Sequence, residues 1–109
     1  MTVNILGTKY TVIETTPEKD VCLCNCDGYC DKTTKQIVIT KQTPDSDLGD
    51  FPAYRRKILR HEIIHAFLFE SGLHENFMHQ MGHDETYVDW IAVQYPKIKR
   101  AFIQAGCDE

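Results

Sequence analysis

The sequence predicts an α+β fold, in which a small, mostly antiparallel N-terminal sheet is followed by helices. Runs of β-branched residues separated by turn residues are confined to residues 1–40. Apolar residues at helical spacing dominate from residue 50 onward. A chain of 109 residues supports one modest hydrophobic core. We therefore expect residues 1–109 to form a single domain whose functional site lies open on one scaffold.

The N-terminal strands are predicted from short apolar segments and the turns between them. Residues 3–6 and 10–13 flank a Gly-Thr-Lys segment, which predicts a tight β-hairpin. A weaker strand is predicted at residues 21–24, and residues 25–28 have the composition of a turn. The most strongly β-branched segment comprises Gln36, Ile37, Val38, Ile39 and Thr40.

The first predicted helix is long. Asp50 is placed to cap its start, Pro52 suits its first turn and Gly72 suits its end. Between these ends, apolar residues recur at helical intervals, at Ile58, Leu59, Ile63, Ala66, Phe67 and Phe69. This spacing predicts a helix that is mostly buried.

A second helical region follows residues 73–82, which show no clean period and are expected to form a loop. Asp84 can cap this region. Pro96 is expected to interrupt or kink it, because proline lacks the N–H of a helical hydrogen bond. A last short helix is predicted over residues 97–105.

Composition and charge argue against several classes of protein. The net charge is −4 and the basic residues are dispersed, so we expect no nucleic-acid partner. No apolar run approaches the roughly twenty residues of a membrane span. The first residues lack the basic and apolar regions of a signal peptide, so we expect a cytoplasmic location.

Five cysteines form a second candidate centre of function. Cys22, Cys24, Cys26 and Cys30 lie within nine positions, while Cys107 stands apart. Their spacing differs from the paired C-x2-C segments of a zinc ribbon, and a reducing cytosol would keep them as thiols. On a strand, alternation would place the first three on one face. We interpret them as structural or incidental thiols, with a metal or redox module as the alternative.

The segment His61-Glu62-Ile63-Ile64-His65 contains the main candidates for metal binding and catalysis. On a helix, His61 and His65 project from the same face and can hold one zinc ion. Glu62 is rotated by roughly 100°, which keeps it out of the ligand set but close to a water molecule at the metal. Zinc lowers the pKa of such a water, and Glu62 would take its proton and pass it to the leaving amine.

A catalytic zinc ion usually has a third protein ligand, and the second predicted helix offers one. Glu85 lies in its first turn, and Asp89 follows one turn later on the same face. Asp89 is placed to accept a hydrogen bond from the second ring nitrogen of His61. His83 is the main rival to Glu85 as third ligand, although only the Glu85 assignment accounts for Asp89.

The combined pattern, His61-Glu62-x-x-His65 followed by Glu85-x-x-x-Asp89, resembles the gluzincin motif of thermolysin-type peptidases. The small size and the order of strands and helices also resemble minimal gluzincins and the phage or mobile-element metallopeptidases of the ImmA/IrrE type. This resemblance implies a minimal zincin-like domain with zinc as its cofactor. It implies two histidines and Glu85 as zinc ligands, Glu62 as general base and acid, and Asp89 as the supporting carboxylate.

The resemblance also implies how a substrate would bind. In such enzymes an edge strand before the active-site helix pairs with an extended peptide, and the strand from Gln36 to Thr40 occupies that position in the sequence. Larger gluzincins supply an oxyanion-stabilising histidine from a C-terminal lobe for which these 109 residues have no room. The candidates for that role here are Tyr87, His79 and His83.

The resulting functional hypothesis is zinc-dependent hydrolysis of peptide bonds in an extended peptide or a flexible protein segment. One alternative is a catalytically idle zinc-binding module of the same fold with an interaction or regulatory role. Another is a metal or redox module centred on the cysteine cluster. The intact Glu62 favours the enzyme over an idle module, because binding alone needs no base.

Overall fold

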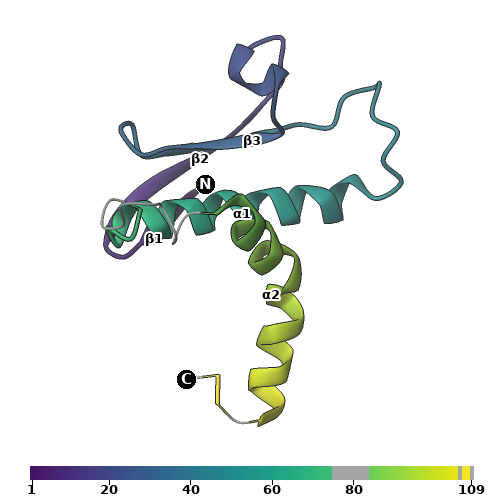
Figure 1. Cartoon of the computed structure of the whole chain (residues 1–109). Helices are drawn as coiled ribbons and strands as arrows, with labels where there is room; N and C mark the ends of the chain where they lie inside the picture. The colour runs from purple at the N-terminus through teal and green to yellow at the C-terminus, as the bar shows by residue number, and fades with distance from the viewer. Residues whose placement is uncertain (75–83, 106, 109) are drawn as a thin grey trace.

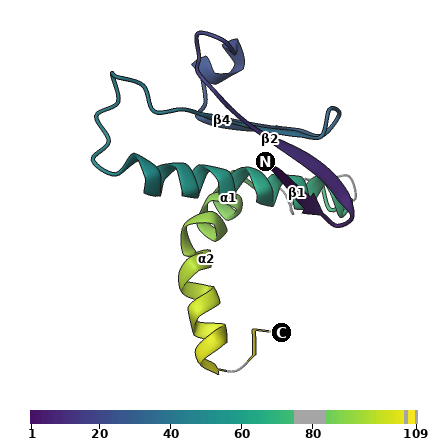
Figure 2. The ribbon, with the colours of Figure 1, turned by 180° about the vertical axis from the view of Figure 1, so that it is seen from behind.

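The computed structural model describes residues 1–74, 84–105 and 107–108, and it confirms the α+β order. Four strands come first, and the helices α1 (Phe51–Glu70) and α2 (Glu85–Ala105) follow. α1 lies along one face of the sheet, and α2 crosses α1 and extends away from the sheet (Figure 1, Figure 2). In the described ranges no helix has the length and apolar character needed to cross a membrane. Most of the predicted loop, residues 75–82, lies outside these ranges.

The sheet contains β1 (Thr2–Ile5), β2 (Thr8–Thr15), β3 (Gly28–Asp31) and β4 (Gln36–Thr40), in the order β1-β2-β4-β3. β1 pairs antiparallel with β2 and β3 pairs antiparallel with β4, whereas β2 and β4 are parallel. Two of the three pairings are thus antiparallel, which confirms the predicted character of the sheet. The hairpin turns just after β1, where two successive residues have positive φ, as a tight two-residue turn requires.

The prediction that residues Gln36 to Thr40 form an edge strand is wrong, because β4 lies between β2 and β3. Ile37, Val38 and Ile39 are each at most 2% exposed, so both faces of this strand are covered. An uninterrupted apolar run is typical of a strand buried on both faces, whereas a strand buried on one face alternates. The edge on this side of the sheet belongs to β3.

A short 3₁₀ helix, η1 (Val21–Cys24), replaces the strand that was predicted at the same residues. The Asp20 side chain accepts a hydrogen bond from the backbone N–H of Cys22 at 3.0 Å, and this bond favours a turn over a strand. The cysteines of this segment therefore do not alternate along a strand face. β3 begins at Gly28, within the segment that was predicted to be a turn.

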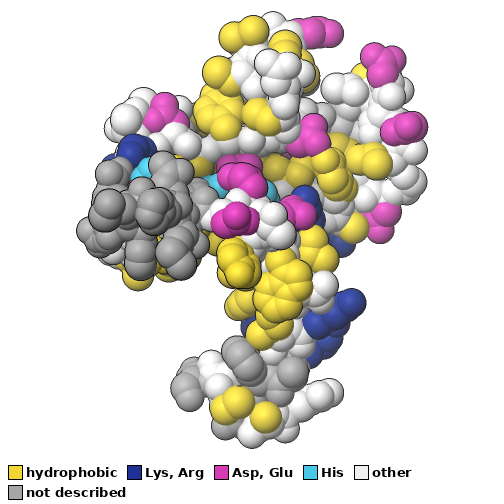
Figure 3. All heavy atoms as spheres, in the orientation of Figure 1, with side chains coloured by type: hydrophobic (Ala, Val, Ile, Leu, Met, Phe, Trp, Pro, Cys, Tyr) yellow, Lys and Arg dark blue, Asp and Glu magenta, His cyan; other side chains and the backbone are white. Residues whose placement is uncertain are grey.

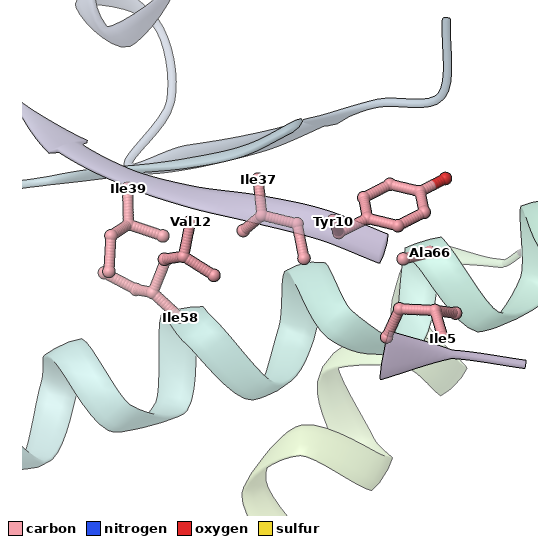
Figure 4. Packing of buried hydrophobic residues seen from close by; sticks show 7 residues of the cluster. All are labelled: Ile5, Tyr10, Val12, Ile37, Ile39, Ile58 and Ala66. Carbon is pink, nitrogen blue, oxygen red and sulfur yellow. The ribbon is translucent and has the colours of Figure 1, made fainter. Parts of the chain in front are cut away.

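α1 begins and ends close to the predicted residues. The Asp50 carboxylate accepts a hydrogen bond from the backbone N–H of Ala53 at 3.0 Å, and Gly72 has a φ of 78° just beyond the helix. The helix is buried along one face only, since Phe67 is 41% exposed. Its inner face packs on the sheet to form the core, which comprises Ile5, Tyr10, Val12, Ile37, Ile39, Ile58 and Ala66 (Figure 4).

α2 is one continuous helix, so the prediction of a separate last helix after Pro96 is wrong. Asp84 caps its start by accepting a hydrogen bond from the backbone N–H of Thr86 at 2.7 Å. Pro96 cannot donate to the carbonyl of Ala92, four residues earlier. That carbonyl instead accepts a hydrogen bond from Arg60 Nε of α1 at 2.6 Å. A contact between the two helices thus replaces the missing backbone bond.

Glu70 ties the end of α1 to the sheet and to the residue before β4. One carboxylate oxygen accepts hydrogen bonds from Lys35 Nζ at 2.5 Å and from Tyr10 OH at 2.7 Å. The other oxygen accepts a hydrogen bond from Thr8 Oγ1 at 3.1 Å. These donors, the Lys35 ammonium first, hold the pKa of the Glu70 carboxyl below its usual range. Folding therefore stabilises the ionised carboxylate.

This contact predicts a pH-dependent loss of stability in Glu70→Gln. A carboxyl whose pKa is lowered by folding contributes stability above its unfolded pKa, about 4.3 for glutamate. That contribution disappears as the pH falls through the lower pKa of the folded state. We expect Glu70→Gln to unfold at a lower temperature than wild type at pH 7, with the difference shrinking below pH ~4. Thermal denaturation followed by circular dichroism measures this.

The matched control is Glu18→Gln, which makes the same change at an exposed glutamate. It should track wild type across the pH range. A Glu70→Gln deficit that stays constant from pH 7 to pH 3 would show that lost packing, and not the carboxylate charge, is responsible.

Candidate metal centre

Two helices bring three potential metal ligands together. His61 and His65 lie on α1, and Glu85 is the first residue of α2. The Nε2 atoms of the two histidines are 3.0 Å apart. Glu85 Oε2 lies 3.1 Å from His61 Nε2, and Glu85 Oε1 lies 3.0 Å from His65 Nε2. The three ligand atoms lie within 4.8 Å of one another, so this group can hold a metal ion.

These are the three residues that the sequence predicts as metal ligands: helical spacing placed the two histidines on one face, and the E-x-x-x-D pattern indicated Glu85 as the third. Glu85 reaches the histidines because α2 crosses α1 with Val88 and Ala92 facing inward, 1% and 0% exposed. Ala92 has almost no side chain, which permits a close approach of the two helices. The crossing leaves the first turn of α2 over the second half of α1 (Figure 1).

Asp89 lies next to the first histidine, as predicted. Its Oδ1 atom is 3.3 Å from His61 Nδ1, on the opposite side of the ring from the potential ligand atom. The same oxygen forms an ion pair with Lys57 Nζ. The Lys57 ammonium is the main reason why the pKa of the Asp89 carboxyl lies below its usual range, and His61 adds to the effect. Asp89 is thus an ionised acceptor facing the imidazole.

Glu62 lines the same cleft as His61, His65 and Glu85, which we call the donor group. Its side chain belongs to the buried face of α1, and the residue is 5% exposed. Burial raises the pKa of its carboxyl to about 7, and the negative charge of Glu85 adds to the rise. A carboxyl that exchanges its proton near neutral pH is suited to general acid and base chemistry.

A cleft of about 670 Å³ opens over these residues between α1 and β3. Histidine and acidic side chains lie next to one another near the middle of this face of the molecule (Figure 3). The lining combines the donor group with residues of the edge strand and its flank: Cys26, Asp27, Gly28, Tyr29, Cys30, Tyr54, Lys57, Ile58, His61, Glu62, His65, Phe69, His74 and Glu85.

Gly28 lets the edge strand approach the helix at the position of Glu62. A Cβ atom added to Gly28 would lie 2.9 Å from Ile58 Cγ2, 3.1 Å from the Val38 carbonyl oxygen and 3.3 Å from Glu62 Cγ. A side chain at this position would therefore push β3 away from α1. No sequence signal pointed to this residue, because glycine beside Asp27 is typical of an ordinary turn.

Two tyrosines of the cleft were also missed by the sequence analysis. Tyr29 OH donates a hydrogen bond to Asp20 at 2.6 Å, and Tyr54 OH donates one to Asp27. Each partner carboxylate raises the pKa of its tyrosine to about 12, since it stabilises the protonated phenol. Both tyrosines therefore stay neutral: Tyr29 links β3 to the start of η1, and Tyr54 links α1 to the residue before β3.

Of the three predicted oxyanion-stabilising residues, only Tyr87 falls within the described part of the chain. Tyr87 lies on α2 with 65% of its surface exposed, and it does not line the cleft. His79 and His83 lie outside the described residues. His74, predicted to be a loop residue, lines the cleft and packs edge-on against Phe69, with ring centroids 4.9 Å apart.

The cysteines do not assemble a ligand group of their own. All five are free, and Cys26 Sγ donates a hydrogen bond to the carbonyl of Cys22 at 3.1 Å. Cys26 and Cys30 line the cleft, and burial raises the pKa of both thiols, that of Cys30 to about 12. Within the part of the chain that the structure describes, only the His61, His65 and Glu85 group has metal-ligand geometry.

No protein-family model matches this chain, and no similar curated protein or solved structure was found. The chemistry that the site can perform is therefore inferred from the arrangement of its own side chains. The imidazoles of His61 and His65 and the carboxylate of Glu85 converge. The Asp89 carboxylate contacts the other ring nitrogen of His61, and Glu62 is buried nearby.

The close approach at Gly28 predicts that Gly28→Ala is destabilising. The added methyl group must displace either the Ile58 side chain or the backbone of β4, which typically costs about 1–3 kcal/mol. Gly49→Ala is the control, because no atom lies within 4 Å of the added Cβ there. Urea denaturation gives both free energies of unfolding. Equal stability of the two variants would contradict the tight contact between β3 and α1.

Proposed function

We propose that this protein is a zinc-dependent peptidase of the gluzincin type, acting on an extended peptide or a flexible protein segment. The observation that carries the proposal is the meeting of His61, His65 and Glu85, from two helices, at 3.0–3.1 Å beside the buried Glu62. This arrangement combines a set of metal ligands with a separate acid–base group. Both are needed for metal-assisted hydrolysis.

The donor set fits zinc. Two imidazole nitrogens and one carboxylate oxygen form a common ligand set for catalytic zinc, and they leave a position open for water or substrate. Nitrogens bound about 2.1 Å from one tetrahedral zinc ion lie about 3.4 Å apart. The two Nε2 atoms are 3.0 Å apart, and each lies 3.0–3.1 Å from one of the two oxygens of Glu85, which is close to that spacing. Small rotations of the side chains would accommodate the ion.

A bound zinc ion would lower the pKa of water and polarise the substrate carbonyl. Glu62 would accept the proton of the attacking water at a carboxylate oxygen and deliver it to the leaving nitrogen. Its burial supports this role, because the carboxyl then holds a proton near neutral pH and is shielded from bulk water. Asp89 would keep the His61 imidazole oriented by accepting a hydrogen bond from Nδ1.

The edge strand β3 offers a place for the substrate. It is the terminal strand of the sheet on the side of the cleft, and Gly28, Tyr29 and Cys30 all line the cleft. An extended peptide can add to such an edge through main-chain hydrogen bonds. On this proposal β3 takes the role that the sequence analysis assigned to β4.

The first test is Glu62→Gln, which removes the base but no ligand. We expect zinc binding close to that of wild type and hydrolysis reduced by about 10²- to 10⁴-fold. Zinc content by elemental analysis and turnover of a mixture of quenched fluorescent peptides measure the two properties. Glu18→Gln is the matched control and should hydrolyse like wild type.

Retained turnover in zinc-loaded Glu62→Gln would refute the assigned mechanism. Zinc binding without hydrolysis in wild type would instead favour the idle binding module. Zinc that survives loss of His61 and disappears with Cys24 or Cys26 would favour the cysteine module.

The second test separates the third ligand from its neighbour. Asp89→Asn should weaken zinc binding by roughly 10- to 100-fold, as changes beside a ligand typically do. Glu85→Ala should weaken it by more, since a ligand itself is lost. Competition with a chromophoric chelator gives both affinities, and Asp45→Asn, an exposed acid in a different segment, is the control. If His83→Ala releases zinc and Glu85→Ala does not, the ligand assignment is wrong.

A further inference from the structure

We propose that Lys57 is a positioning residue of the metal centre: it anchors Asp89, and through Asp89 it keeps the His61 imidazole directed at the other ligands. This inference rests on the metal site of the proposed function and adds a residue to it. Lys57 lies on α1 one turn before His61, so both side chains leave the same face of the helix. Asp89 approaches that face from α2.

The side chains of Lys57 and His61 contact the same oxygen atom of Asp89. Asp89 Oδ1 lies 3.3 Å from His61 Nδ1 and forms the ion pair with Lys57 Nζ. With an ionised carboxylate as acceptor, both nitrogens donate to the same oxygen. The three side chains thus form a bridge from α1 to α2 and back to α1. His61 Nε2 is left on the opposite side of the ring, toward His65 and Glu85.

Asp89 needs such an anchor because its own surroundings do not hold it. Its side chain is 46% exposed, and the contact with His61 at 3.3 Å is longer than a strong charge-assisted hydrogen bond. A carboxylate this exposed can rotate into solvent. The Lys57 side chain is 28% exposed, so its stem is largely packed and its ammonium is a less mobile partner.

Lys57 is also the only lysine or arginine among the described residues that line the cleft. It pairs with the Asp89 carboxylate and lines the cleft together with Glu62 and Glu85, so its positive charge offsets part of the negative charge there. Arg60 also links the two helices, but it donates to the backbone carbonyl of Ala92, whereas Lys57 pairs with the Asp89 carboxylate. Arg60 therefore docks the helices without contacting Asp89, which makes it a useful comparison.

The test measures zinc affinity by chelator competition in Lys57→Met, Lys57→Arg and the double variant Lys57→Met/Asp89→Asn. We expect Lys57→Met to weaken zinc binding by roughly tenfold, within the range for residues that act through a ligand. Lys57→Arg should restore most of the affinity, because arginine can also donate to the carboxylate. The double variant should bind zinc about as well as Asp89→Asn alone, since the two changes break the same bridge.

Two controls separate positioning from other effects. Lys97→Met removes one exposed positive charge from α2 and should leave zinc affinity unchanged. Arg60→Met removes a helix–helix hydrogen bond and should lower the melting temperature of the metal-free protein more than it lowers zinc affinity. Visible spectra of the cobalt-substituted proteins report ligand geometry and should change in Lys57→Met but not in Lys97→Met.

Several outcomes would overturn the inference. Unchanged zinc affinity in Lys57→Met, no rescue by Lys57→Arg, or losses that multiply in the double variant would each show that Lys57 does not act through Asp89. A loss of affinity in Arg60→Met as large as that in Lys57→Met would assign the effect to helix docking. These results leave the proposed function intact if wild type still binds zinc through His61 and hydrolyses peptides. Conversely, the expected affinities without any hydrolysis would support the inference and refute the peptidase.

Discussion

The crossing of α2 over α1 is the contact on which the site depends. It buries Val88 and Ala92 and places the first turn of α2 beside the two histidines of α1. Arg60 secures the crossing by donating to the carbonyl that Pro96 leaves without a backbone donor. A proline that would weaken an isolated helix therefore strengthens the docking between two helices, because the exposed carbonyl is free to accept a side-chain donor. Without this crossing Glu85 would have no relation to the histidines.

The sheet supplies the opposite wall of the cleft and sets the environment of the buried acid. Gly28 allows β3 to lie against Ile58 and Glu62, and this proximity excludes water from the Glu62 carboxyl. Burying a carboxyl costs free energy, and the cost appears here as a pKa raised to about 7. Carboxyl groups with such raised pKa values are frequent at functional sites. The burial of Glu62 agrees with the acid–base role that we propose for it.

Charged side chains surround the two histidines on two sides. Glu62 and Glu85 form a first layer that lines the cleft, while a second layer, the ion pair of Asp89 with Lys57, lies at the Nδ1 side of His61. A divalent cation would be attracted by the first layer, and the second would hold an imidazole in the orientation that binds it. The terminal strand β3 runs along the same cleft, so on the proposed function a peptide added to its edge would lie beside the donor group and Glu62.

The sequence by itself determined the features that depend on neighbouring residues. The shared face of His61 and His65, the caps at Asp50 and Asp84 and the strand at Gln36–Thr40 all follow from short-range periodicity and backbone hydrogen bonding. The motif spacing also indicated Glu85 as a partner of the histidines, but only the tertiary structure decided the order of the strands, the continuity of α2, the crossing of the two helices that brings Glu85 there, and the contact of Lys57 with Asp89. These depend on contacts between segments far apart in the chain, and local spacing carries no information about which segments will pack together.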